Sequence, residues 1–127
     1  MKPTKQPTPA ELAILQVLWR RGPSTVREVH AALDREKPTG YTTVLKLMQI
    51  MAEKGLVARD ERQRAHVYRA RLPRVETQKR LVADLLDRAF GGSAAQLVMQ
   101  ALSARRASPQ ELAQIRRMLE EYERNSR

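Results

Sequence analysis

Residues 39–70 read TGYTTVLKLMQIMAEKGLVARDERQRAHVYRA, and this stretch decides the fold. Its first part has the spacing of an amphipathic helix, because Val44, Met48 and Met51 fall on one face when each residue turns the chain by about 100°. Gly55 is the residue type at which such a helix commonly stops. The pattern therefore predicts a helix over Tyr41–Lys54 with one apolar and one polar face.

After Gly55 the apolar residues change to a spacing typical of strands. Leu56–Arg59 and His66–Ala70 are short segments of this kind, and the charged residues 60–64 between them predict a hairpin tip. A helix followed at once by a basic two-stranded hairpin is typical of a winged helix.

Two further helices are expected before this stretch. The first starts near Pro9 and stops at Gly22-Pro23. The second follows directly, capped either by Ser24 or by a capping box of Thr25 with Glu28, and ends before Pro38. Residues 1–8 are expected to form a disordered basic arm. A short turn between the second and third helices predicts a helix-turn-helix, so residues 9–72 are expected to form a winged helix-turn-helix domain.

The chain is expected to be helical again over residues 73–127, so the fold class is mainly α with a small β-hairpin. Apolar seams run along these helices, and a segment of this size has too little apolar mass to be stable alone. The seams pack either against a second copy or back on the same chain, and we favour a dimerisation domain. The residues expected at the dimer contact are Leu85, Leu86, Leu97, Leu102, Leu112, Ile115, Leu119 and Tyr122.

The charge of the chain favours a polyanionic partner. The 24 basic and 14 acidic residues give a formal net charge of +10. Residues 1–72 hold 14 basic and 7 acidic side chains, net +7, whereas residues 73–127 hold 10 and 7, net +3. A basic surface displaces the counterions condensed on phosphate, so the first half carries the signal for a nucleic acid.

The polar face of the third predicted helix is the candidate for reading DNA. Thr42 and Thr43 suit phosphate oxygens, whereas Lys46 and Gln49 are long enough to reach base edges in a major groove. The alternative is an ordinary solvated face. Tyr41 either places its hydroxyl on a phosphate or closes the small core.

Several arginines lie in or beside the predicted hairpin. Arg62 and Arg64 are expected to contact the DNA backbone or a minor groove, while the roles of Arg59, Arg69 and Arg71 stay open. The alternative for these charges is protection of an exposed strand edge.

Other classes of function find little support. The chain has no cysteine, and His30 and His66 lie in different predicted elements, so we expect no metal site and no cofactor. No nucleophile, base and orienting acid fall at a catalytic spacing, so the chain is not expected to be an enzyme. It shows neither a signal peptide nor a membrane-spanning run, which predicts a cytoplasmic protein without membrane insertion.

The chain resembles the penicillinase-repressor (BlaI/MecI) family over most of residues 9–72. The segments that carry the resemblance are ELAILQVLW at residues 11–19, TVREVHAAL at 25–33, GYTTV at 40–44 running into Gln49, EKGLV at 53–57 and RAHVY at 64–68. The C-terminal part is similar in length and helix pattern only.

The resemblance implies a repressor that binds a DNA operator as a homodimer. In the family, the helix matching Tyr41–Lys54 enters the major groove, the wing approaches the DNA backbone and the C-terminal helices form the dimer. The family also suggests control of antibiotic or cell-wall stress genes.

This chain departs from the family at two positions. Many relatives have an arginine directly after the position of Gln49, where this chain has Ile50. Family repressors of β-lactam resistance are inactivated through a membrane sensor-protease pathway, by cleavage at an Asn-Phe bond. The nearest alignment gives Gln100-Ala101 here, which leaves that mode of induction without support. The copper-responsive branch is excluded, because its metal motif needs cysteine.

The sequence therefore predicts a sequence-specific repressor on a palindromic operator. The alternatives are a winged-helix module that binds protein and a protein that coats nucleic acid without sequence preference.

Overall fold

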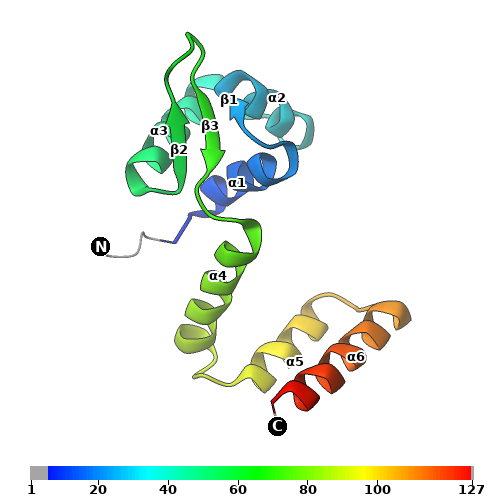
Figure 1. Cartoon of the computed structure of the whole chain (residues 1–127). Coiled ribbons are helices and arrows are strands. Elements are labelled where there is room, and N and C mark those ends of the chain that lie inside the picture. The colour runs from blue at the N-terminus through cyan, green and yellow to red at the C-terminus, as the bar shows by residue number, and fades with distance from the viewer. Residues whose placement is uncertain (1–5, 127) are drawn as a thin grey trace. The chain divides into compact units, whose positions relative to one another are not determined.

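A computed structural model describes residues 6–126 of the chain. The elements follow in the order α1, β1, α2, α3, β2, β3, α4, α5 and α6 (Figure 1). Their bounds are α1 Pro9–Arg21, β1 Ser24–Thr25, α2 Val26–Glu36, α3 Tyr41–Lys54, β2 Val57–Asp60, β3 Val67–Ala70, α4 Arg74–Ala89, α5 Ala94–Ala104 and α6 Pro109–Asn125. The predicted fold class, mainly helical with a small β-hairpin, is confirmed.

The starts of the helices follow from capping residues. Thr25 and Glu28 form the capping box that was one of two alternatives for α2. A second capping box, of Thr8 with Glu11, begins α1. The disordered arm predicted for residues 1–8 includes Thr8, which the structure instead orders as this cap. The rest of that arm lies mostly in residues 1–5, outside the described residues.

The end of α3 is set by Gly55. This glycine has a φ of 83° and lies in the left-handed region, where its backbone N–H turns back to bond to the last turn of α3. A side chain at Cβ disfavours that conformation, so glycine is the residue that stops α3 and starts β2 without strain.

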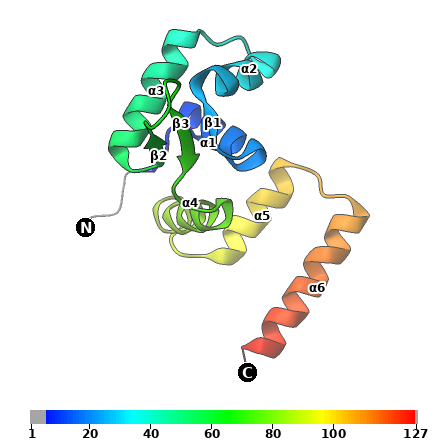
Figure 2. The same ribbon diagram turned by 45° about the horizontal axis from the view of Figure 1, so that its top comes forward.

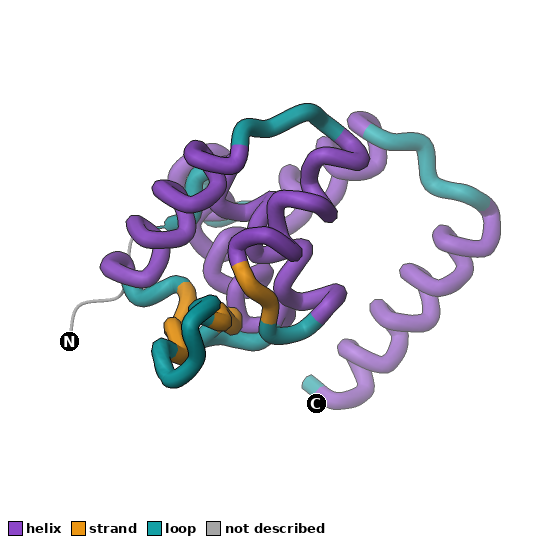
Figure 3. The backbone as a smooth tube through the Cα atoms, turned by 90° about the horizontal axis from the view of Figure 1, so that it is seen from above, coloured by secondary structure: helices purple, strands orange, loops and turns teal. Residues whose placement is uncertain are grey.

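The strands form one antiparallel sheet in the order β1-β3-β2. The predicted hairpin of β2 with β3 is confirmed, and in its register Arg59 lies opposite Tyr68. The expectation of two strands was incomplete, because β1 pairs with the other edge of β3. Two residues are too few to show a strand period in the sequence. Figure 3 shows the three strands grouped beside the helices.

The core lies where α1, α2 and α3 contact one another and the sheet (Figure 2). The predicted apolar face of α3 supplies Val44, Met48 and Met51, all fully buried. From β3, Tyr68 is also buried in this core. The indole N–H of Trp19 on α1 donates a hydrogen bond to the backbone oxygen of Leu72 at 3.1 Å, and so fixes the chain as it leaves the sheet.

The chain divides into two compact units, the first ending at Leu81 and the second beginning at Val82. The division falls inside α4, nine residues after the predicted boundary at residue 72. The first turns of α4 belong to the winged unit, where Thr77 is buried.

The second unit, by contrast, lacks a core of its own. None of residues 82–126 is buried. Its helices α5 and α6 begin at Ser93 and Ser108, each of which accepts a hydrogen bond from the backbone three residues later. Both capping serines agree with the sequence pattern. The side chain of Glu111 does not bond back to Ser108, so the capping box expected there is not formed.

Candidate nucleic-acid interface

The exposed face of α3 is the first part of the candidate interface. Thr42, Thr43, Lys46 and Gln49 are all exposed, on the side opposite the buried apolar face. The N-cap of α3 is Gly40, which makes no side-chain capping bond. The free backbone N–H groups of a helix start, together with its positive dipole end, suit a phosphate group.

Hydrogen bonds hold the turn that leads into α3. The His30 ring lies 2.7 Å from the backbone oxygen of Thr39, which accepts a hydrogen bond from Nε2. Asp34 accepts a second bond, from the Thr39 backbone N–H, at 3.2 Å. His30 therefore connects α2 to the turn, and we assign it a structural role.

Tyr41 packs at the same place. Its ring meets the His30 ring edge-on, with centroids 5.7 Å apart and an angle of 79° between the planes. Its side chain is 43% exposed. The ring thus rests on His30 outside the buried core, and the role of its hydroxyl on a phosphate stays a prediction.

A groove of about 410 Å³ connects α3 with the wing, which we define as β2, β3 and the hairpin tip at residues 61–66. The groove brings together three predicted residues, Tyr41, Gln49 and Arg64. It also adds Arg27, from the first turn of α2, which the sequence reasoning missed. Its full lining is Thr25, Val26, Arg27, Tyr41, Leu45, Gln49, Arg59, Arg64, Ala65, His66 and Tyr68.

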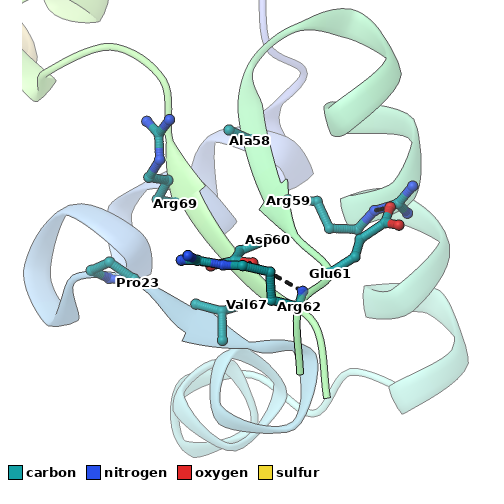
Figure 4. A pocket seen from close by; sticks show the side chains of 8 residues that line it. All are labelled: Pro23, Ala58, Arg59, Asp60, Glu61, Arg62, Val67 and Arg69. Atoms are coloured by element: carbon teal, nitrogen blue, oxygen red, sulfur yellow. Dashed lines mark hydrogen bonds and ion pairs between the residues drawn. The ribbon is translucent and has the colours of Figure 1, made fainter. Parts of the chain in front are cut away.

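The two wing arginines that the sequence singled out lie in different surroundings. Arg64 lines the groove beside α3, whereas Arg62 lines a separate hollow of about 680 Å³ with Pro23, Val67 and Arg69 (Figure 4). Both arginines lie in the hairpin tip, between the end of β2 at Asp60 and the start of β3 at Val67. The conformation of this turn, and not the alternation of a strand, sets the direction of each side chain.

Carboxylates of the wing pair with two of its arginines. Glu61 lies 2.7 Å from Arg59, and Asp60 lies 2.7 Å from Arg62. The pKa of Arg59 is raised, first by the Tyr68 side chain and then by Glu61. Hydrogen bonds from the Arg62 side chain and backbone lower the pKa of Asp60 to about 2. Among the ion pairs of residues 6–126, none includes Arg64.

A buried ion pair fixes the far end of α3. The Nζ of Lys54 lies 2.8 and 2.9 Å from the two carboxylate oxygens of Glu11 on α1. Glu11 is buried and also accepts a bond from the Thr8 backbone. Burial, the largest single influence, raises its pKa, but the bonds from Lys54 and Thr8 outweigh burial and leave the pKa lowered. The pattern of Thr8 with Glu11 three residues later was the missed signal in the sequence.

The described residues contain no group of three or more His, Asp or Glu side chains placed to hold a metal ion. Within the same residues, no helix has both the length and the apolar character needed to cross a membrane.

One protein family matches nearly the whole chain. The model of the family described as "Penicillinase repressor" matches residues 7–121. The chain belongs to the penicillinase repressor family.

A relative of known name matches most of the chain, and a solved structure matches part of it. A protein named "Transcriptional regulator BlaI", found in two strains of Mycobacterium tuberculosis, is 35% identical over 114 residues. The matched region covers 89% of this chain and 82% of the relative. The chain is also similar to the solution structure of the DNA binding domain of the repressor BlaI, with a TM-score of 0.52 and 23% identity. That match covers 58% of this chain and 90% of the other, and it shows the winged-helix fold.

The two departures from the family pattern lie at exposed positions. Ile50, the first departure expected from the resemblance, is 37% exposed on α3. Gln100 and Ala101, the second, are exposed within α5.

The residues predicted at the dimer contact all lie on the helices of the second unit, α4 to α6. Leu85, Leu119 and Tyr122 are exposed, the last by 73% of its surface. The remaining five are half-buried: Leu86, Leu97, Leu102, Leu112 and Ile115.

Proposed function

We propose that this protein is a transcriptional repressor that binds operator DNA as a homodimer, without catalytic activity. The observation that carries the proposal is the groove in which Gln49 of α3, Arg27 of α2 and Arg64 of the wing line one surface. The names of the relatives support a regulator. The DNA partner also favours the predicted cytoplasmic location.

In this proposal α3 lies in the major groove. Thr42 and Thr43, with the free N–H groups of the helix start, bind phosphates and set the position of α3 on the duplex. Lys46 and Gln49 reach the base edges, where a lysine pairs with guanine and a glutamine with adenine. Arg64, from the wing, contacts the adjacent backbone or minor groove.

The second unit supplies the dimer contact. Several large apolar side chains are exposed there, and no residue of the described part of this unit is buried. Exposed apolar surface of this extent is typical of a protein interface. We propose that a second copy covers it, because a two-fold dimer places two α3 helices on two half-sites of a palindromic operator.

Replacing Lys46 or Gln49 with alanine is expected to reduce the discrimination between operator and random DNA. Each good pair of hydrogen bonds to a base contributes about 1–3 kcal/mol of discrimination, or about 5- to 150-fold. The operator is first selected from genomic fragments with the purified protein, and both affinities are then measured by fluorescence anisotropy. Lys79→Ala on α4 and Gln16→Ala on α1 are matched controls, because both residues are exposed on helices outside the proposed interface. Undiminished discrimination in both test variants would contradict the assignment of α3.

Salt dependence separates the proposal from a module that binds protein. Each neutralised phosphate is expected to make the plot of log affinity against log salt steeper by about 0.9. A steep slope with an enriched palindrome supports the repressor. A steep slope without any preferred site indicates a coating protein, and no DNA binding at any salt concentration indicates the protein-binding module.

A further inference from the structure

The last residue of β2, Asp60, places its carboxylate directly against an exposed arginine of the hairpin tip, Arg62. Asp60 Oδ1 accepts hydrogen bonds from Nε and from the backbone N–H of Arg62, both at 3.0 Å. Asp60 Oδ2 lies 2.7 Å from Nη2 and 3.2 Å from Nε. The carboxylate therefore engages one whole edge of the guanidinium as well as the turn backbone (Figure 4).

This arrangement matches the way in which an arginine binds a phosphate. A guanidinium presents two parallel N–H donors to two oxygens, and carboxylate and phosphate compete for the same donors. The Arg62 side chain is 88% exposed, so Asp60, rather than burial, is what orients it. Since the pKa of Asp60 is lowered to about 2, its carboxylate keeps its charge near neutral pH.

We propose that Asp60 lowers the affinity of the wing for the DNA backbone by holding the guanidinium of Arg62 where a phosphate would otherwise bind. This inference rests on the proposed function. It names Asp60 as the residue that limits the affinity of the wing for DNA of any sequence. Phosphate contacts supply most of the affinity for random DNA, whereas base contacts supply specificity. When Asp60 holds Arg62, the wing adds less affinity for random DNA. The base contacts of α3 then account for a larger share of the total affinity for the operator.

Asp60 is a better test position than the second wing carboxylate, Glu61. Glu61 pairs with Arg59, which also interacts with Tyr68 and lines the groove beside α3. A change at Glu61 would alter the groove itself. The hollow that contains Asp60 and Arg62 is also lined by Arg59 and Glu61. Neither Asp60 nor Arg62 lines the groove, so a change at Asp60 leaves the lining residues of the groove unaltered.

The test is Asp60→Asn, measured against operator and random DNA over a range of salt concentrations. An asparagine oxygen still accepts the backbone N–H of Arg62, so the turn is retained and the charge is lost. We expect tighter binding to both DNAs and a salt slope steeper by about 0.9 for each wing that binds. Between 50 and 200 mM salt this corresponds to an extra loss of affinity of about three- to fourfold per wing.

Two matched variants separate release of Arg62 from a change in net charge. Glu36→Gln makes the same charge change at an exposed residue of α2 that belongs to none of the ion pairs among residues 6–126. We expect the slope of this control to stay at the wild-type value. Adding Arg62→Ala to Asp60→Asn restores the wild-type net charge and is expected to remove the gain.

Three results would overturn the inference. Equal slopes for Asp60→Asn and Glu36→Gln would mean that a freed Arg62 binds no phosphate. A gain that persists after Arg62→Ala would assign the effect to another residue. If the wild-type protein binds no DNA at any salt concentration, the proposed function itself fails, and that result is distinct from the other two.

Discussion

Replacing Ile115 and Leu119 together with aspartate is expected to convert the protein into a monomer. Both residues lie on the apolar seam of α6, and Leu119 is 60% exposed. In a dimer these positions would be covered by the second copy. Burying two unpaired carboxylates there would cost more free energy than the apolar contact between the copies contributes. Loss of the second half-site is expected to reduce operator affinity by about 100-fold or more.

Sedimentation shows the oligomeric state, and anisotropy with labelled operator gives the affinity. Gln110→Asp with Gln114→Asp is the matched control, because it places two aspartates at the same spacing on the polar side of α6. Fluorescence of Trp19, the single tryptophan of the chain, reports whether the winged unit stays folded. A double variant that still sediments as a dimer would exclude α6 as the interface. A monomer with unchanged operator affinity would show that binding does not need two copies.

Replacing Lys54 with methionine is expected to destabilise the winged unit by about 2–4 kcal/mol, as for a buried pair that loses one partner. The Glu11 side chain is 3% exposed, and in the variant it would keep its negative charge without a cation beside it. Because Lys54 is 22% exposed, the expected loss of stability is set below that of a fully buried pair. This is a large part of the 5–15 kcal/mol that stabilises a typical domain. Denaturant unfolding followed by Trp19 fluorescence measures the loss.

Two comparisons show whether the ion pair causes this effect. Lys79→Met makes the same substitution at an exposed site on α4 and is expected to change stability little. Glu11→Gln combined with Lys54→Met removes the uncompensated charge and is expected to recover part of the loss, because the amide oxygen still accepts from the Thr8 backbone. A Lys54→Met protein as stable as the Lys79→Met control would show that the pair contributes nothing.

The same pair predicts how the stability of the winged unit depends on pH. The folded pKa of Glu11 lies below its ordinary value of 4.5, so the unfolded chain binds the proton more tightly than the folded one. The stabilisation is therefore fully present above about pH 4.5 and is lost as the pH falls through the lowered folded pKa. The free energy of unfolding of wild type and of Glu11→Gln, each measured at neutral and acidic pH, gives the part of the acid sensitivity that Glu11 causes. If both proteins lose the same stability in acid, Glu11 does not cause the loss.

Local structure was largely readable from the sequence. The bounds of α3 and the capping box of Thr25 with Glu28 follow from residues within one or two helical turns of each other. Such signals are local, because capping bonds and apolar spacing are set inside a single segment. Strand β1 escaped prediction, since two residues carry no period and its partner β3 lies more than 40 residues later in the chain.

The neighbours of each functional side chain were decided by the tertiary structure. Sequence alone identified the polar face of α3 and a basic wing, and it placed apolar seams on the C-terminal helices. Packing α1 against α3 brought Glu11 to Lys54, 43 residues away. The turn at the hairpin tip placed Arg62 and Arg64 in different hollows, and the fold of α2 beside the wing added Arg27 to the groove. Spacing along a chain fixes which face of an element a residue occupies, whereas distances between elements depend on how their buried faces pack together.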